Sequence, residues 1–160
     1  MTKACLLEMI VTSLSVDLTT LTEAARAAHA AATHEECQPD NKYDTTGLEA
    51  SYIAQGQANR AAEVRRALER YRALELRSFD AGSPVRLTAL VTLEAEDGSR
   101  RQVFLGPDAG GLKLAGPTGE IIIVTIESPL GRALLGRVVG EEIETGNGGS
   151  RKNFTIVTVA

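Results

Sequence analysis

The chain is poor in the residue types that mark several common protein classes. It holds no tryptophan, three tyrosines, three phenylalanines and two cysteines in 160 residues. So few aromatic side chains leave no basis for a wide core or an aromatic-walled ligand pocket. Cys5 and Cys37 would lie near opposite ends of one helix, roughly 48 Å apart at the helical rise, which is too far for a disulfide. We therefore expect reduced thiols and a cytoplasmic protein.

An excess of basic charge is also lacking, since the formal net charge is -4. Duplex-DNA-binding domains usually present a basic face, so this balance disfavours that class. The apolar stretch 4–16 is not typical of a signal peptide, because Glu8 interrupts it and no small-residue cleavage site follows. With 43% hydrophobic and 24% charged residues, the composition indicates one or two small soluble domains and no membrane association.

What the sequence does have is a heptad pattern in its first half, interrupted once. Apolar or small residues recur at alternating steps of three and four, which is the seam of a coiled coil. The members are Leu7, Val11, Leu14, Leu18, Leu21, Ala25, Ala28 and Ala32, and then Ala50, Ala54, Gln57, Ala61, Val64, Leu68 and Tyr71. Facing partners such as Leu18 with Leu68 have residue numbers of nearly constant sum, as expected of an antiparallel hairpin. We predict helices from about residue 2 to 36 and from about 45 to 76, with the turn centred near Tyr43.

The turn, residues 37–52, is predicted to be the functional end of this hairpin. Pro39 ends the first helix, because a proline inside a helix removes a hydrogen bond and clashes with the preceding turn. Thr46 and Glu49 have the spacing of a capping box at the start of the second helix, which gives Glu49 a purely structural interpretation as well as a functional one. At about 1.5 Å per residue the arm would be roughly 45 Å long, too long for a core element of so small a chain.

In the second half of the chain, apolar and polar residues alternate as in β-strands. Residues 81–84 interrupt the helical pattern, and we predict the domain boundary there. Alternation predicts strands at 85–93, 101–106, 121–126, 138–145 and 154–159, and Asp97-Gly98 predicts a hairpin turn. Between them, 128–136 has the pattern of a short helix, with Ser128 as N-cap and Pro129 at the first helical position. We expect an α+β protein: an antiparallel coiled-coil hairpin at 1–80 and a small antiparallel sheet with one short helix at 81–160.

Two motifs in this second half resemble a known family. The segment SPLGRALLG (128–136), followed by GEEIE (140–144), closely resembles the signature of the C-terminal domain of the Gre family of bacterial transcript-cleavage factors. The hairpin resembles their N-terminal coiled coil. The resemblance implies an FKBP-like fold that docks at the rim of the secondary channel of RNA polymerase, while the coiled coil passes down that channel. On this basis the predicted polymerase contacts include Ser128, Pro129, Leu130, Gly131 and Arg132; fold alone does not imply prolyl isomerase activity, and none is expected.

The resemblance also assigns roles at the tip. In the family, acidic tip residues help polymerase hold a second Mg²⁺ and orient the water that cleaves the RNA of a backtracked complex. Asp44 takes the place of the family's aspartate, but three residues later this chain has Gly47 where the family has a glutamate. The predicted catalytic residues are Asp44, Glu49 and Asp40; the predicted ligands of the shared Mg²⁺ are Asp44 and Glu49; further predicted partner contacts are Tyr43 and Lys42.

Three functions stay open. The first is stimulation of cleavage by polymerase, with the 3′ end of the nascent RNA approached only indirectly. The second is regulation from the same channel without efficient cleavage, as in anti-Gre relatives. The third, which the coiled coil alone permits, is a scaffold or oligomerisation protein, although a charged tip without an apolar patch favours the polymerase. In each case the chain is no enzyme by itself, no cofactor is tightly bound, and the oligomeric state is left open.

Overall fold

The computed structural model describes residues 1–33 and 46–160. The first half forms two helices, α1 (Lys3–Thr33) and α2 (Thr46–Arg72). By Cα packing the chain divides into two compact units, one made of Met1–Ile10 with Arg70–Ala160 and the other of Val11–Glu69. The domain boundary predicted at residues 80–81 lies where the sequence pattern changes from helix to strand, which is a different criterion from Cα packing. It stays a prediction.

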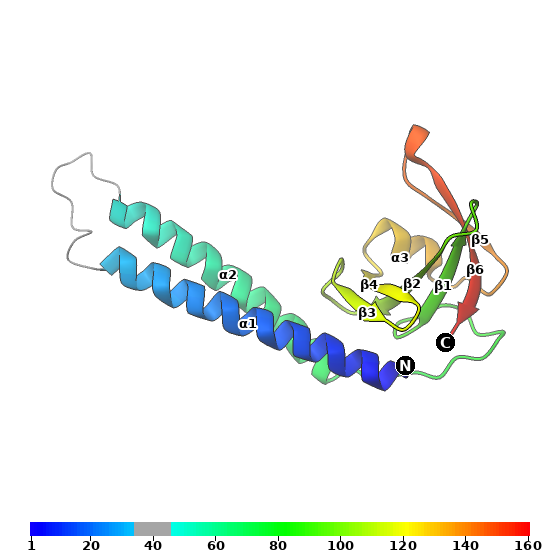
Figure 1. Ribbon diagram of the computed structural model, residues 1–160, viewed down its shortest axis with the longest axis horizontal. Helices are drawn as coiled ribbons and strands as arrows, with labels where there is room; N and C mark the ends of the chain where they lie inside the picture. The colour runs from blue at the N-terminus through cyan, green and yellow to red at the C-terminus, as the bar shows by residue number, and fades with distance from the viewer. Residues whose placement is uncertain (34–45) are drawn as a thin grey trace. The chain divides into compact units, whose positions relative to one another are not determined.

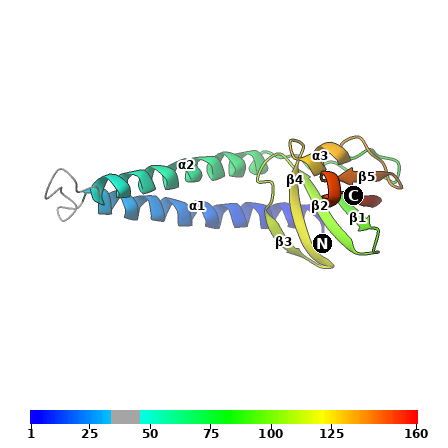
Figure 2. The ribbon, with the colours of Figure 1, turned by 90° about the horizontal axis from the view of Figure 1, so that it is seen from above.

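Within the unit Val11–Glu69, α1 and α2 lie side by side in both views (Figures 1 and 2). Most buried residues of α2 follow the heptad seam: Ala54, Ala61, Val64 and Leu68 are buried and Gln57 is half-buried, while Ala67, next to the seam, is also buried. On α1, Leu14 of the predicted seam is buried, and Leu18, Leu21, Ala25 and Ala28 are half-buried. Near the start of α1 the seam prediction is one residue off, because Leu6 and Ile10 are fully buried whereas the predicted Leu7 and Val11 are half-buried. The prediction of a helical hairpin is confirmed.

The second half forms one six-stranded sheet in the order β3-β4-β2-β1-β6-β5. Its strands are β1 (Leu90–Ala95), β2 (Arg100–Gly106), β3 (Lys113–Gly116), β4 (Gly119–Thr125), β5 (Glu142–Thr145) and β6 (Lys152–Val159). Helix α3 (Pro129–Leu134) follows β4, and a 3₁₀ turn (Gly148–Ser150) lies between β5 and β6. The sheet therefore carries one short helix, as predicted.

One strand pair departs from the antiparallel sheet that the sequence predicts. β2 and β4 are parallel, with Val103 opposite Ile122 and Leu105 opposite Val124, whereas the other four pairs are antiparallel. Parallel strands require a crossover connection. Residues 107–118, with the four-residue strand β3 that was not predicted, provide it and bring β4 back alongside β2.

Apolar side chains are buried on both faces of this sheet. On one face Leu93, Val103, Leu105 and Ile156 form the core with Leu134 of α3. Phe104, Ile121 and Ile123 lie on the opposite face, because neighbours along a strand alternate, and they are also buried. There Tyr71, in the last turn of α2, occupies the space over Gly106, where any side chain would overlap its hydroxyl.

The segment that joins α2 to the sheet contains less helix and less strand than predicted. α2 ends at Arg72 rather than near residue 76, and β1 begins at Leu90 rather than at 85. Residues before β1 turn instead, because Thr88 has a positive φ of 74° and its hydroxyl accepts a hydrogen bond from the Arg77 amide at 2.9 Å. Lys3 of α1 donates to the carbonyls of Arg77 and Thr88, and so holds this segment in place.

Candidate functional site

Most of the predicted tip site lies outside the described residues. Asp40, Lys42, Tyr43 and Asp44 fall between the described ranges, so their predicted roles stay predictions. Glu49 is described: its side chain is exposed in the first turn of α2, where a carboxylate is favoured by the helix dipole. Among residues 1–33 and 46–160 no group of three or more His, Cys, Asp or Glu side chains could hold a metal ion.

The first turns of α2 expose apolar side chains. Leu48, Tyr52 and Ile53 are 54%, 68% and 58% exposed, and residues 46–59 contain no lysine or arginine. The expectation that no apolar patch lies near the tip is therefore wrong for these turns. The sequence contained the signal, because all three residues lie off the heptad seam that runs through Ala50 and Ala54.

The predicted docking motif places α3 through hydrogen bonds at its N-terminus. The Ser128 side chain accepts a hydrogen bond from the Gly131 amide at 3.0 Å and donates one to the Thr125 carbonyl at 2.8 Å. Pro129 occupies the first helical position, where its missing N–H costs nothing. The N-cap prediction for Ser128 is confirmed, and the cap ties α3 to the last residue of β4.

Position 131 needs glycine because its surroundings leave no room for a side chain. It is buried, and a Cβ at this position would overlap the Thr125 carbonyl oxygen. Gly136, after the helix, has a positive φ of 80° and donates its amide to the Val85 carbonyl at 2.8 Å. These two glycines therefore position α3 closely against the sheet. Because Gly131 is buried, its role is to support the helix and not to contact a partner directly.

The outward side of the same motif carries the residues that a partner can reach. Pro129, Arg132 and Leu135 are exposed, and Leu130 is half-buried against the core. Leu135 is 47% exposed and Val139, shortly after it, is 38% exposed. Of the five predicted contact residues, Pro129 and Arg132 thus have the accessibility that docking needs, while Ser128 and Gly131 support them.

An open groove of about 590 Å³ lies beside α3. Its floor is β4, one wall contains Ser128, Pro129 and Leu130, and the other contains Gly110 and Gly111 of the β2–β3 connection. Apolar residues such as Ile122, Val124 and Leu130 make up much of its lining. A groove of this shape fits a protein segment better than a small polar substrate, since few convergent polar side chains line it.

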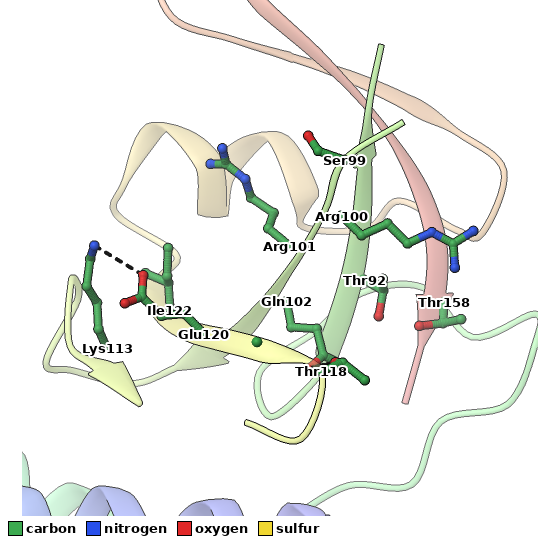
Figure 3. Close-up of a pocket in the computed structure, with 11 residues that line it drawn as sticks. Thr92, Ser99, Arg100, Arg101, Gln102, Lys113, Thr118, Glu120, Ile122 and Thr158 are labelled. Carbon is green, nitrogen blue, oxygen red and sulfur yellow. Dashed lines mark hydrogen bonds and ion pairs between the residues drawn. The ribbon is translucent and has the colours of Figure 1, made fainter. Parts of the chain in front are cut away.

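A second hollow, of about 740 Å³, lies where the β1–β2 and β3–β4 hairpins turn (Figure 3). Strand register places Thr92, Gln102 and Thr158 on one face of the sheet, and Arg101 and Ile122 on the other. Its cations are engaged: Lys113 pairs with Glu120 at 3.1 Å, Arg100 with Glu94 at 2.8 Å, and Arg101 lies over the Phe154 ring. The lining is thus divided between the two faces of the sheet, and its basic side chains already have partners.

Helix α1 is long and apolar enough, by length and composition alone, to cross a membrane over Lys3–Ala31. This is weak evidence, since packed helices and signal sequences share the property. Leu6 and Ile10 are fully buried in the protein, and Glu8, Asp17 and Glu23 interrupt the segment. The absence of membrane association stays a prediction.

Comparison with known proteins connects the α3 half of the chain to one family. The family model described as "Transcription elongation factor, GreA/GreB, C-term" matches residues 81–160. Among solved structures, the chain is similar to the transcription factor Gfh1 at 27% identity and a TM-score of 0.42, over 96% of this chain and 92% of that one.

Two further solved structures are similar to this chain. Gfh1 of Thermus aquaticus is 24% identical with a TM-score of 0.42, over 95% of this chain and 92% of that one. The transcription elongation factor GreA/GreB from Nitrosomonas europaea is 24% identical with a TM-score of 0.39, over 65% and 78%. No curated protein sequence matches the chain significantly.

Proposed function

Because the chain belongs to the GreA/GreB family of transcription elongation factors, whose partner is RNA polymerase, we propose that it regulates elongation from the secondary channel of that enzyme. The α3 groove docks at the channel rim and the hairpin enters the channel. The observation that carries this proposal is the α3 motif. Its buried residues fix the helix, its exposed Pro129 lines an open groove together with Ser128 and Leu130, and Arg132 and Leu135 of the same segment are exposed. As a cytoplasmic regulator the chain has no catalytic activity alone.

The length of the two helices supports the proposed entry of the hairpin into the channel. α1 has 31 described residues and α2 has 27, which correspond to about 46 Å and about 40 Å of helix at 1.5 Å per residue. The outer face of α2 beyond Asn59 is charged, with Arg60 paired to Glu63 at 2.9 Å. Its first turns expose three apolar side chains and lack cations, which suits contact with protein more than with RNA.

At the tip we propose modulation of polymerase without efficient RNA cleavage. Gly47 stands where the family resemblance expects a glutamate, and Glu49 lies further along, inside the first turn of α2. Asp44 and Glu49 are the residues that would hold Mg²⁺ jointly with polymerase, because carboxylates are the hard oxygen ligands this ion prefers. Such an ion would stabilise the charge that develops on the phosphate during cleavage.

A cleavage assay tests this assignment. Stalled, backtracked elongation complexes of the cognate polymerase are incubated with Mg²⁺ and the wild-type chain, Asp44→Asn or Glu49→Gln. We expect the wild type to bind without accelerating RNA cleavage, and to slow the cleavage stimulated by a true Gre factor. Faster cleavage with wild type, lost in either variant that still binds, would show instead that the tip is catalytic.

The exposed Leu48, Tyr52 and Ile53 favour one alternative function, self-association of the hairpin as a scaffold. Exposed apolar clusters often mark protein contacts. Three side chains over about two helical turns are nevertheless small against the 1,200–2,000 Å² or so that a stable interface buries. Light scattering after size-exclusion chromatography decides: a monomer excludes the scaffold, whereas an oligomer that Leu48→Ser with Ile53→Ser converts to monomer supports it.

A further inference from the structure

The connection between β2 and β3 is held by the last turn of α2. Tyr71 donates its hydroxyl hydrogen to the Asp108 carbonyl at 2.7 Å, and the Arg70 guanidinium pairs with the Asp108 carboxylate at 3.1 Å. The other carboxylate oxygen of Asp108 accepts a hydrogen bond from the Ala109 amide at 2.7 Å. Both the main chain and the side chain of Asp108 are therefore fixed, and we call these contacts the Asp108 clamp.

The residues that follow Asp108 form one wall of the α3 groove. Ala109 has a positive φ of 57°, which is uncommon for a residue with a side chain and has to be maintained by its surroundings. Gly110 lies against Thr125, where an added Cβ would come within 3.3 Å of its methyl group. The Gly111 amide donates to the Ile123 carbonyl at 2.8 Å. The clamp thus precedes a strained turn that leads directly into the groove wall.

The opposite wall is fixed to the same strand end. The Thr125 carbonyl accepts hydrogen bonds from the Ser128 amide and hydroxyl, at 3.1 and 2.8 Å, and Gly131 packs on it. Thr125 therefore contacts Gly110 of one wall and supports Ser128 of the other. The width of the groove depends on both contacts, and only the Gly110 side is tied to α2.

We propose that Asp108 is a positioning residue for the docking groove, through which the last turn of α2 sets the wall formed by Gly110 and Gly111. This inference rests on the proposed docking of the groove on RNA polymerase. Neither Arg70 nor Tyr71 lines the groove. Their effect on polymerase affinity is therefore indirect and passes through the 108–111 turn.

The main test variant is Tyr71→Phe in the full chain, because it removes the hydrogen bond to Asp108 and keeps the ring over Gly106. Asp108→Ala is the second variant. Arg72→Gln is the matched control, since Arg72 is exposed in the same turn and none of the described residues forms an ion pair with it. We expect Tyr71→Phe to weaken polymerase binding roughly three- to tenfold, the scale of one lost hydrogen bond, and Arg72→Gln to leave it unchanged.

A double-mutant cycle separates positioning from general destabilisation. Tyr71→Phe is combined with Pro129→Ala, which alters the opposite wall, and polymerase affinity is measured at a temperature where every variant is fully folded. If the clamp acts through the groove, the two losses are not additive, and the loss from Tyr71→Phe shrinks in the Pro129→Ala background. Additive losses would overturn the positioning role.

Amide hydrogen exchange provides a readout that does not need polymerase. In Tyr71→Phe and Asp108→Ala the Gly111 amide should exchange faster, while the Gly98 amide in the β1–β2 turn should not change. Unaltered exchange at Gly111 would overturn the inference even if polymerase binds. Faster exchange at Gly111 in a chain whose wild type does not bind polymerase would refute the proposed function and leave the clamp as the determinant of the turn.

Discussion

The Gly131 position shows how a single residue fixes helix α3. Alanine there would place a Cβ onto the Thr125 carbonyl, which is backbone and cannot move away cheaply. We expect Gly131→Ala to lower the free energy of unfolding by about 1–3 kcal/mol or more, despite the better helix propensity of alanine. Gly56→Ala is the matched control, since nothing lies within 4 Å of its added Cβ and α2 should gain up to about 1 kcal/mol.

Chemical denaturation of both glycine variants checks this prediction. The midpoint should fall for Gly131→Ala and rise slightly for Gly56→Ala. Equal midpoints in the two variants would mean that α3 is not held against β4 as described.

Tyr71 gives stability a dependence on alkaline pH. Burial raises the pKa of its phenol well above the ordinary value near 10, with a smaller upward contribution from the nearby Asp108 charge. A raised pKa means that the folded state favours the neutral phenol. Its contribution to stability is therefore complete below about pH 10 and is lost as the pH rises from there through the folded-state pKa.

Urea midpoints of the wild type and Tyr71→Phe between pH 8 and pH 11 or so measure this effect. The wild type should lose stability more steeply above about pH 10 than the variant does. Parallel curves would show that the Tyr71 hydroxyl titrates as it does in water.

Among the elements, α3 depends most clearly on one cap. Ser128→Ala removes the acceptor for the Gly131 amide and the donor to Thr125, and should cost about 1 kcal/mol of stability. Ser128→Asn keeps an acceptor at the N-cap and should recover most of it. Thermal unfolding of the three proteins tests this, and equal melting temperatures for the alanine and asparagine variants would argue against the cap.

Elements with a strong period were predictable from the sequence, and elements set by distant contacts were not. The seam of α2 through Ala54, Ala61 and Leu68 was predicted because heptad spacing is local. The parallel β2–β4 pair was missed because it depends on the crossover through β3, a strand of four residues between glycine-rich turns. Likewise, alternation at 85–89 predicted a strand, but hydrogen bonds to Arg77 and Leu105 turn the chain at Thr88.

The candidate site was likewise predictable from the sequence only in part. The motif at 128–136 was found from sequence, because N-cap serine, N1 proline and a terminating glycine have fixed spacing. The groove beside it and the Asp108 clamp were not, since Gly110, Gly111 and Tyr71 come together only through the sheet. The sequence alone also could not show that Gly131 is buried against Thr125 while Arg132 is exposed.

The whole molecule joins a sheet domain to a helical hairpin whose first α2 turns expose Leu48, Tyr52 and Ile53 and whose later turns are charged. In the proposed function the domain provides affinity and the hairpin tip provides regulation. Both parts must therefore contact polymerase at the same time, at different places on the enzyme.

Site-specific photo-crosslinking tests that central claim most directly. A photoreactive amino acid replaces Tyr52 on α2 or the exposed Leu135 after α3, and each full-length protein is irradiated with cognate RNA polymerase. We predict crosslinks from position 52 to residues that line the secondary channel, and from position 135 to residues at its rim. Crosslinks from position 135 alone would contradict channel entry, and no crosslink from either position would contradict the polymerase assignment as a whole.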